Sequence, residues 1–142
     1  MMKVGEVFKS DVSAKRELPL FLSKIRAGFP SPADDYLDKK LDLNEYLIKH
    51  PASTFFVKVK GDSMIKAGIH SGDILVVDRS VEAKDKNIVI AVLNGEFTVK
   101  RVCIKDKKLF LLSENEVYKP IEVREDEHFE IWGVVLHVIH TV

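Results

Sequence analysis

The segment from Ile88 to Ile104 constrains the fold most strongly, because it contains two apolar runs joined by a two-residue turn. Ile88–Leu93 and Glu96–Ile104 flank Asn94-Gly95, a pair that favours the type I′ turn of an antiparallel hairpin. Other runs share this strand-like pattern; they are Thr54–Lys60, Asp73–Asp78, Leu109–Leu112 and Phe129–Ile139, the last interrupted by Gly133. Many short strands joined by tight turns predict a mainly β, antiparallel fold of the barrel or sandwich type.

The first 41 residues differ from the rest, because their apolar positions follow neither strand nor helix periodicity. We therefore expect an extended N-terminal arm over residues 1–41 and one folded domain over residues 42–142. A short strand or helix is expected in the arm near Leu18–Leu22. A short helix is expected to begin at Asp42, with Glu45 in the position that completes a capping box, and to end at Pro51.

Composition excludes several classes of protein. The chain has 142 residues with 22 Lys and Arg against 22 Asp and Glu, so it lacks the basic excess of a sequence-specific DNA-binding protein. Its single cysteine, Cys103, lies in an alternating run and predicts a buried or half-buried strand thiol. The five histidines lack metal-ligand spacing, so no metal and no other cofactor is expected. No signal peptide or membrane-spanning stretch is evident, so a cytoplasmic protein is expected.

Ser63 and Lys100 form a candidate catalytic pair. Ser63 lies in Gly61-Asp62-Ser63-Met64, directly after a predicted strand, and Lys100 lies on the second strand of the hairpin. A lysine acts as a base for a hydroxyl when its amine is neutral, and burial lowers its pKa from about 10.4. The two residues are therefore candidates for a Ser-Lys dyad. Taken singly, each also fits an ordinary role, as a turn serine and a solvated strand lysine.

The expected surroundings of this pair suit hydrolysis. A turn beyond the end of a strand presents backbone N–H groups, and those of Asp62 and Ser63 are candidates for stabilising an oxyanion. Met64 and Ile65 are expected to provide apolar packing that keeps water from the amine. Strand alternation does not decide the burial of Lys100, because both faces of its strand mix polar and apolar residues.

Several motifs together resemble the UmuD family, whose founding member is the self-cleaving subunit of a bacterial SOS mutagenesis polymerase. The motifs are Phe29-Pro30-Ser31-Pro32-Ala33 with Asp35-Tyr36, Asp42-Leu43-Asn44, His50-Pro51, Phe56-Val57-Lys58, Gly61-Asp62-Ser63-Met64-Ile65, Gly68-Ile69 with Gly72-Asp73, and Gly95-Glu96-Phe97-Thr98-Val99-Lys100. The resemblance runs from about residue 17 to the C-terminus. The motifs around Ser63 and Lys100 are shared with the wider LexA-like peptidases, whereas the Phe-Pro-Ser-Pro and Asp-Leu-Asn motifs are more specific to UmuD.

The resemblance implies a mainly β, LexA-like and signal-peptidase-like fold with a short helix and an extended arm. It implies that Ser63 is the nucleophile, that Lys100 is the neutral general base, and that self-cleavage occurs between Ala27 and Gly28. UmuD typically has cysteine at the first of these two positions, whereas this chain has alanine, as LexA repressors do. A filament of RecA on single-stranded DNA is the implied stimulus. The shortened product is then expected to form a homodimer that joins a UmuC-like Y-family polymerase in translesion synthesis.

Other classes fit less well. A LexA-type repressor needs a helix-turn-helix ahead of the peptidase core, and the first 41 residues show neither the helical periodicity nor the basic excess for one. Type I signal peptidases also use a Ser-Lys dyad, but they carry a membrane anchor. A non-enzymatic polymerase accessory protein with a vestigial dyad remains the main alternative, and a plain linker remains the alternative for the segment around Ala27 and Gly28.

Overall fold

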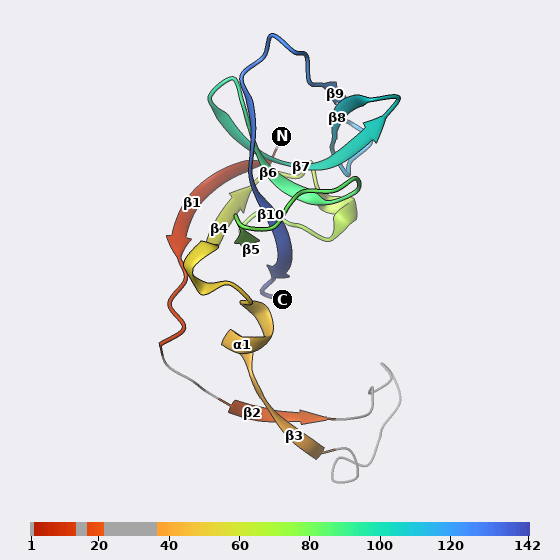
Figure 1. Cartoon of the computed structure of the whole chain (residues 1–142). Coiled ribbons are helices and arrows are strands. Elements are labelled where there is room, and N and C mark those ends of the chain that lie inside the picture. Colours follow the sequence, from red (N-terminus) through yellow and green to blue (C-terminus); the bar gives the residue numbers. More distant parts are fainter. Residues whose placement is uncertain (1, 14–16, 22–36) are drawn as a thin grey trace. The chain divides into compact units, whose positions relative to one another are not determined.

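The computed structural model describes residues 2–13, 17–21 and 37–142 (Figure 1). The chain divides into two compact units: Met1–Ser10 with His50–Val142, and Asp11–Lys49. The proposed division into an arm of residues 1–41 and a domain of residues 42–142 stays a prediction.

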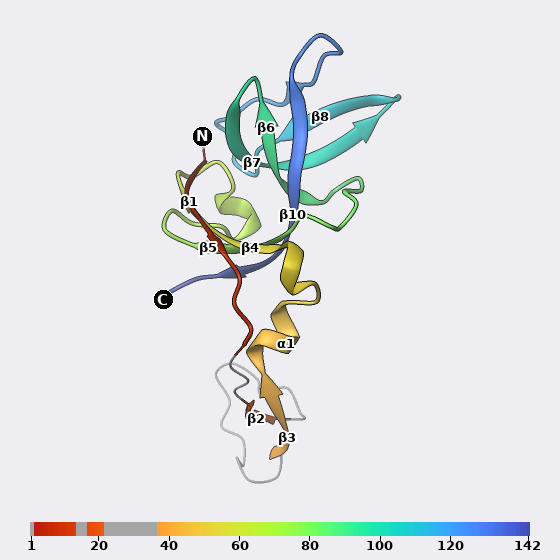
Figure 2. The same cartoon turned by 60° about the vertical axis from the view of Figure 1, so that its left-hand side comes forward.

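The larger unit is one antiparallel sheet that closes on itself (Figures 1 and 2). Its strands, in sheet order, are β1 (Lys3–Lys9), β4 (Thr54–Lys60), β5 (Ile74–Asp78), β10 (Phe129–Ile139), β6 (Ile88–Leu93), β7 (Glu96–Lys105), β8 (Lys108–Leu112) and β9 (Ile121–Glu122). Pairing of Lys3 in β1 with Thr98 in β7 closes the ring of strands, and β8 and β9 extend from β7. Two short 3₁₀ helices, η2 (Pro51–Ser53) and η3 (Ile65–Ala67), precede β4 and β5. The predicted mainly β fold is confirmed.

Local sequence accounts for the tight turns of this sheet. Asn94 and Gly95 have φ values of 51° and 83°, which suit the predicted type I′ turn between β6 and β7. Asp106 and Lys107, with φ values of 52° and 61°, make a second tight turn between β7 and β8. Gly133 lies at a register shift in β10, where an added Cβ would lie 2.5 Å from Cγ1 of a valine in β5. A glycine is therefore required there by the close approach of β5.

Strand β1 was not predicted. It pairs along β4, but most of its side chains are exposed, including those of Val7 and Phe8. Only Met2, just before the strand, is fully buried. Of the strand's side chains, Val4 packs against the core, which is too little to give an alternating signal in the sequence. Backbone pairing with β4 and β7 holds the strand in place.

The smaller unit contains β2 (Glu17–Phe21), β3 (Leu37–Asp42) and α1 (Leu43–Leu47), with β2 and β3 antiparallel. The short strand or helix expected near Leu18–Leu22 is a strand, β2. Asp42 caps α1 as predicted, since its carboxylate accepts a hydrogen bond from the Asn44 backbone N–H at 2.9 Å. The helix is shorter than the predicted span to Pro51, because Ile48 already has extended backbone angles. None of the helices in the described part of the chain is long and apolar enough to cross a membrane.

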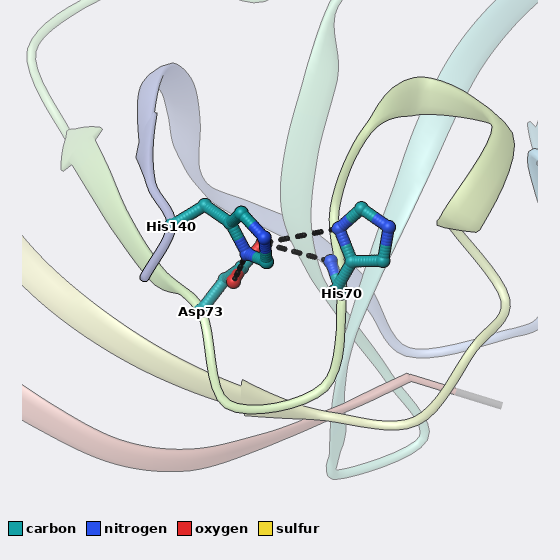
Figure 3. A group of neighbouring side chains, drawn as sticks. All are labelled: His70, Asp73 and His140. Atoms are coloured by element: carbon teal, nitrogen blue, oxygen red, sulfur yellow. Dashed lines mark hydrogen bonds and ion pairs between the residues drawn. The ribbon is translucent and has the colours of Figure 1, made fainter. Parts of the chain in front are cut away.

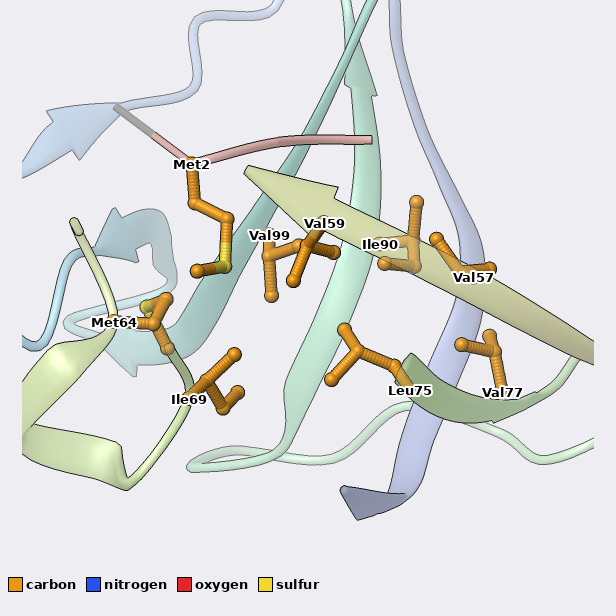
Figure 4. Packing of buried hydrophobic residues seen from close by; sticks show 9 residues of the cluster. All are labelled: Met2, Val57, Val59, Met64, Ile69, Leu75, Val77, Ile90 and Val99. Atoms are coloured by element: carbon orange, nitrogen blue, oxygen red, sulfur yellow. The ribbon is translucent and has the colours of Figure 1, made fainter. Parts of the chain in front are cut away.

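Two apolar clusters form the core of the larger unit. The first lies inside the closed ring of strands and contains Met2, Val57, Val59, Met64, Ile69, Leu75, Val77, Ile90 and Val99 (Figure 4). The second contains Val89, Ala91, Val102, Leu111 and Val134. Residues of β6 and β7 contribute to both clusters, because successive side chains of a strand point to opposite faces.

Asp78 ends β5 and is fully buried. Its carboxylate accepts hydrogen bonds from the hydroxyls of Ser80 at 2.7 Å and Ser53 at 2.8 Å, and it lies 2.6 Å from Nδ1 of His50. Burial raises the pKa of Asp78, but these bonds from Ser80, His50 and Ser53 outweigh burial and lower the pKa to about 2. This carboxylate therefore ties the end of β5 to the turn ahead of β4.

We expect Asp78→Ala to lower the free energy of unfolding by about 1–3 kcal/mol at pH 7, because Ser80, His50 and Ser53 lose a buried, charged acceptor. A carboxyl whose folded pKa is depressed stabilises the fold above its unfolded pKa and loses that effect as pH falls. The destabilisation should therefore shrink between about pH 4 and pH 2. Urea unfolding of both proteins at pH 7 and pH 3 measures it, with Asp126→Ala as the exposed control. Equal loss at both pH values would contradict the assignment.

Candidate active site

Ser63 lies in the turn that follows β4, where Gly61 adopts a φ of 107° and reverses the chain. Its side chain is fully buried. The loop after β8 holds this turn: the Asn115 side-chain amide donates to the Asp62 carbonyl at 3.0 Å, and the Tyr118 hydroxyl donates to the Asp62 carboxylate at 2.7 Å. The loop after β8, which is distant in the sequence, thus helps to fix the position of Ser63.

Lys100 is on β7, directly opposite Val89 of β6, and is 1% exposed. Val102, on the same face of β7, belongs to the second apolar cluster together with Val89. Burial lowers the pKa of Lys100 from 10.5 to about 8. The alternation pattern did not decide whether Lys100 is buried. The structure shows that it is, with apolar residues of both β6 and β7 on the same side of the sheet.

The structure brings the two residues together. Lys100 Nζ lies 3.4 Å from Ser63 Oγ and 2.9 Å from Ser113 Oγ. A neutral amine at this place can accept the Ser63 proton through its lone pair while donating an N–H to Ser113. The arrangement can therefore generate a serine nucleophile, although the catalytic roles of Ser63 and Lys100 stay predictions.

Sequence reasoning missed Ser113, but a signal for it exists. The two-residue turn between β7 and β8 fixes the register, which pairs Arg101 with Leu112. Continuing this register by one residue places Ser113 opposite Lys100. A hydroxyl beside a buried lysine could thus have been found from the turn and the strand lengths alone.

Met2 is a second neighbour that the sequence did not indicate. Its backbone N–H donates to Ser63 Oγ at 2.8 Å, and its carbonyl accepts from the Thr98 hydroxyl at 2.9 Å. Its side chain is fully buried and packs with Met64 in the first apolar cluster (Figure 4). The residue ahead of β1 therefore fills space directly beside the candidate nucleophile.

The remaining predicted site residues have different outcomes. Ala27 and Gly28 lie outside the described residues. The oxyanion role of the Asp62 and Ser63 backbone stays a prediction. Met64 is fully buried, as expected. Ile65 opens η3 and is 44% exposed, and its shielding of the amine stays a prediction.

Comparisons with known proteins show the family to which this chain belongs. The sequence pattern of the family described as Peptidase S24-like matches residues 19–136. MucA of Salmonella typhimurium is 43% identical over 137 residues, which cover 96% of this chain and 93% of MucA. SamA of Salmonella typhimurium is 48% identical over 122 residues, covering 86% of this chain and 84% of SamA. The LexA repressor of Stenotrophomonas maltophilia is 40% identical over 113 residues, covering 80% of this chain and 53% of the repressor. The chain therefore belongs to the Peptidase S24-like family, as its resemblance to UmuD implied.

Proposed function

We propose that this protein is a self-cleaving serine peptidase of the UmuD type, which cuts its own chain between Ala27 and Gly28. The strongest support is the buried amine of Lys100, 3.4 Å from Ser63 Oγ. With its pKa lowered to about 8 by burial, a usable fraction of this amine is neutral near neutral pH. An ordinary lysine, with a pKa of about 10.4, is almost entirely charged there.

In the proposed reaction, Ser63 Oγ attacks the carbonyl carbon of Ala27 while its proton moves to Lys100 Nζ. The tetrahedral intermediate collapses, the bond to the Gly28 nitrogen breaks, and the Lys100 ammonium protonates that nitrogen. Water then hydrolyses the ester on Ser63; Lys100 accepts a proton from this water and returns one to Ser63 Oγ. The backbone N–H groups of Asp62 and Ser63 are the proposed donors to the oxyanion.

Ser113 is the proposed positioning residue for the base. A neutral amine has one lone pair, and catalysis requires that lone pair to face the serine hydroxyl. Donation of an amine N–H to Ser113 Oγ, 2.9 Å away, limits rotation of the Lys100 amine. The lone pair is then more often directed toward Ser63.

The contact from Met2 gives a physical reason for latency in this proposal. A scissile carbonyl must approach Ser63 Oγ from a free direction, whereas the Met2 N–H already donates to that oxygen at 2.8 Å. A hydrogen bond donated to the oxygen also makes it a weaker nucleophile. The residues that lead into β1 must therefore move before cleavage.

The biological setting follows from the family. Its UmuD-like members act in SOS mutagenesis, so we propose that a RecA filament on single-stranded DNA stimulates the cut. The shortened chain would form a homodimer and join a UmuC-like Y-family polymerase as an accessory subunit in error-prone translesion synthesis. Cleavage would thus convert a latent protein into a polymerase partner.

The cleavage site provides the test. On prolonged incubation at mildly alkaline pH, purified protein should yield a fragment that begins at Gly28, as measured by intact mass. Gly28→Glu should block this cleavage almost completely, because a groove that holds small residues excludes a long side chain and glutamate restricts the backbone. Ala27→Cys is the matched control and should be cut, because cysteine is also small.

Two outcomes would contradict the proposal. A fragment that begins elsewhere would place the cut at another bond. A wild-type protein that stays intact, alone and with RecA filaments, would favour the alternative of a non-enzymatic accessory protein with a vestigial dyad. Circular dichroism of Gly28→Glu shows that a blocked variant is still folded.

A further inference from the structure

Three potential metal ligands meet at one end of the larger unit. His70 and Asp73 come from the turn between η3 and β5, and His140 follows the end of β10 (Figure 3). One ligand atom from each residue lies within 4.8 Å of the other two. Sequence spacing does not show this group, because His140 and Asp73 are 67 residues apart and only the pairing of β10 with β5 joins them.

The carboxylate at the centre of this group is held in place. Asp73 is 3% exposed, and its carboxylate accepts a hydrogen bond from the His70 backbone N–H at 2.8 Å. The turn is closed further by a bond from the Asp73 backbone N–H to the His70 carbonyl at 3.1 Å. One ligand is therefore preorganised on a rigid turn, which lowers the cost of assembling a site.

The imidazoles of His70 and His140 both lie beside this carboxylate. His140 Nδ1 is 2.6 Å from one carboxylate oxygen, and His70 Nδ1 is 3.8 Å from the other. The ring centroids are 4.7 Å apart, and the two side chains are 43% and 45% exposed. Half-exposed rings can rotate slightly without disturbing the core, and water can reach them from the solvent.

We propose that His70, Asp73 and His140 form a binding site for a late first-row divalent cation, with Zn²⁺ as the best match. Two imidazoles and one carboxylate suit zinc, which in open sites takes three protein ligands and water. Ligand atoms in a tetrahedral zinc site lie about 3.4 Å apart, given metal–ligand distances of about 2.1 Å. The 2.6 Å contact between His140 and Asp73 must therefore open slightly, and the 3.8 Å separation between His70 and Asp73 must close slightly. Magnesium and calcium prefer all-oxygen sites and fit poorly.

A bound ion would join the turn ahead of β5 to the end of β10. Those two strands already pair, with Ile74 opposite Ile139 at this end of the ladder. The ion would replace the direct contact between His140 and Asp73 and would restrain the last residues of the chain. It would therefore stabilise the folded state without involving Ser63 or Lys100.

Titration of the untagged, full-length protein with zinc chloride tests this site. Isothermal titration calorimetry should give one ion per chain, and the midpoint of thermal unfolding should rise with zinc. At a free zinc concentration of about 100 times Kd, the unfolding equilibrium constant should fall about 100-fold. Removing one of the three ligands by His140→Ala or His70→Ala should weaken binding more than about 100-fold, the upper range for loss of an outer-shell partner.

The matched control is His128→Ala, which removes an exposed histidine in the loop between β9 and β10. It should bind zinc like the wild type. Cobalt(II) offers a second readout, since visible absorption bands should appear on binding and disappear in Asp73→Asn. Wild-type binding that persists in both histidine variants, or an absence of binding by the wild type, would overturn the proposal. Both histidine variants alter half-exposed side chains, so they should fold normally, and circular dichroism checks this.

Discussion

Ser63→Ala is expected to abolish self-cleavage while leaving a folded protein. Loss of the nucleophile removes covalent catalysis entirely, and comparable losses in serine hydrolases lower the rate by about 10⁴-fold to 10⁶-fold. The fold should persist, because Ser63 contributes only a hydroxyl to the core. Stability should fall by about 1–3 kcal/mol, because the buried Met2 N–H loses its acceptor.

The fraction cut after long incubation measures the first effect, and urea unfolding measures the second. Ser63→Cys is the informative control, because a thiolate is a nucleophile of similar position and should retain part of the activity. Cleavage at Ala27–Gly28 that continues in Ser63→Ala would show that the nucleophile lies elsewhere. The alanine variant also provides an uncut chain for testing whether arm removal is needed for dimer formation.

The sequence predicts the middle of the sheet well, because its signals are local. Two-residue turns such as Asn94-Gly95 fix both the hairpin and its register. Alternating or continuous apolar runs then mark the strands on either side. These signals depend only on neighbouring residues, so β4 to β8 could be placed without knowing the closed topology.

Closure of the ring could not be predicted in the same way. β1 buries little of its apolar side chains, since Val7 and Phe8 are 45% and 48% exposed, and its place depends on backbone pairing with two distant strands. The contact of Met2 with Ser63 depends on this closure and was missed with it. The early end of α1 at Leu47 was also missed, because Pro51 gave the stronger stop signal.

In the candidate active site, too, local sequence predicts the residues but not the long-range contacts between them. Ser63 and Lys100 were named from motifs, but their 3.4 Å separation depends on how the turn after β4 folds over β7. Burial lowers the pKa of Lys100, and this burial depends on how β7 packs with its neighbours, including β6, where Val89 lies opposite Lys100. Long-range features of this kind, including the meeting of His140 with Asp73, need the topology before they can be inferred.

Lys100 should control both the rate of cleavage and its pH dependence. The neutral amine is the proposed base, and burial lowers its pKa to about 8. The neutral fraction, and with it the rate without a coprotease, should rise about tenfold between pH 7 and pH 9 and then level off. Initial rates of fragment formation across pH 6–10 measure this profile, and a flat or falling rate would contradict a lysine base.

Two variants of Lys100 distinguish its role as a base from the effect of its positive charge. Lys100→Arg keeps a cation that stays protonated at every accessible pH, so it should lose cleavage by at least about 10³-fold although the charge is retained. Lys100→Met removes the charge with a side chain of similar volume, and it should be equally inactive.

The methionine variant should also be more stable than the wild type at pH 7. A lysine whose folded pKa is lowered is penalised below that pKa, and the penalty disappears as pH rises toward the unfolded value of about 10.4. Urea unfolding at pH 7 and pH 10 should therefore show a stability difference that narrows with pH. A methionine variant that still cleaves would exclude Lys100 as the base, whatever its stability.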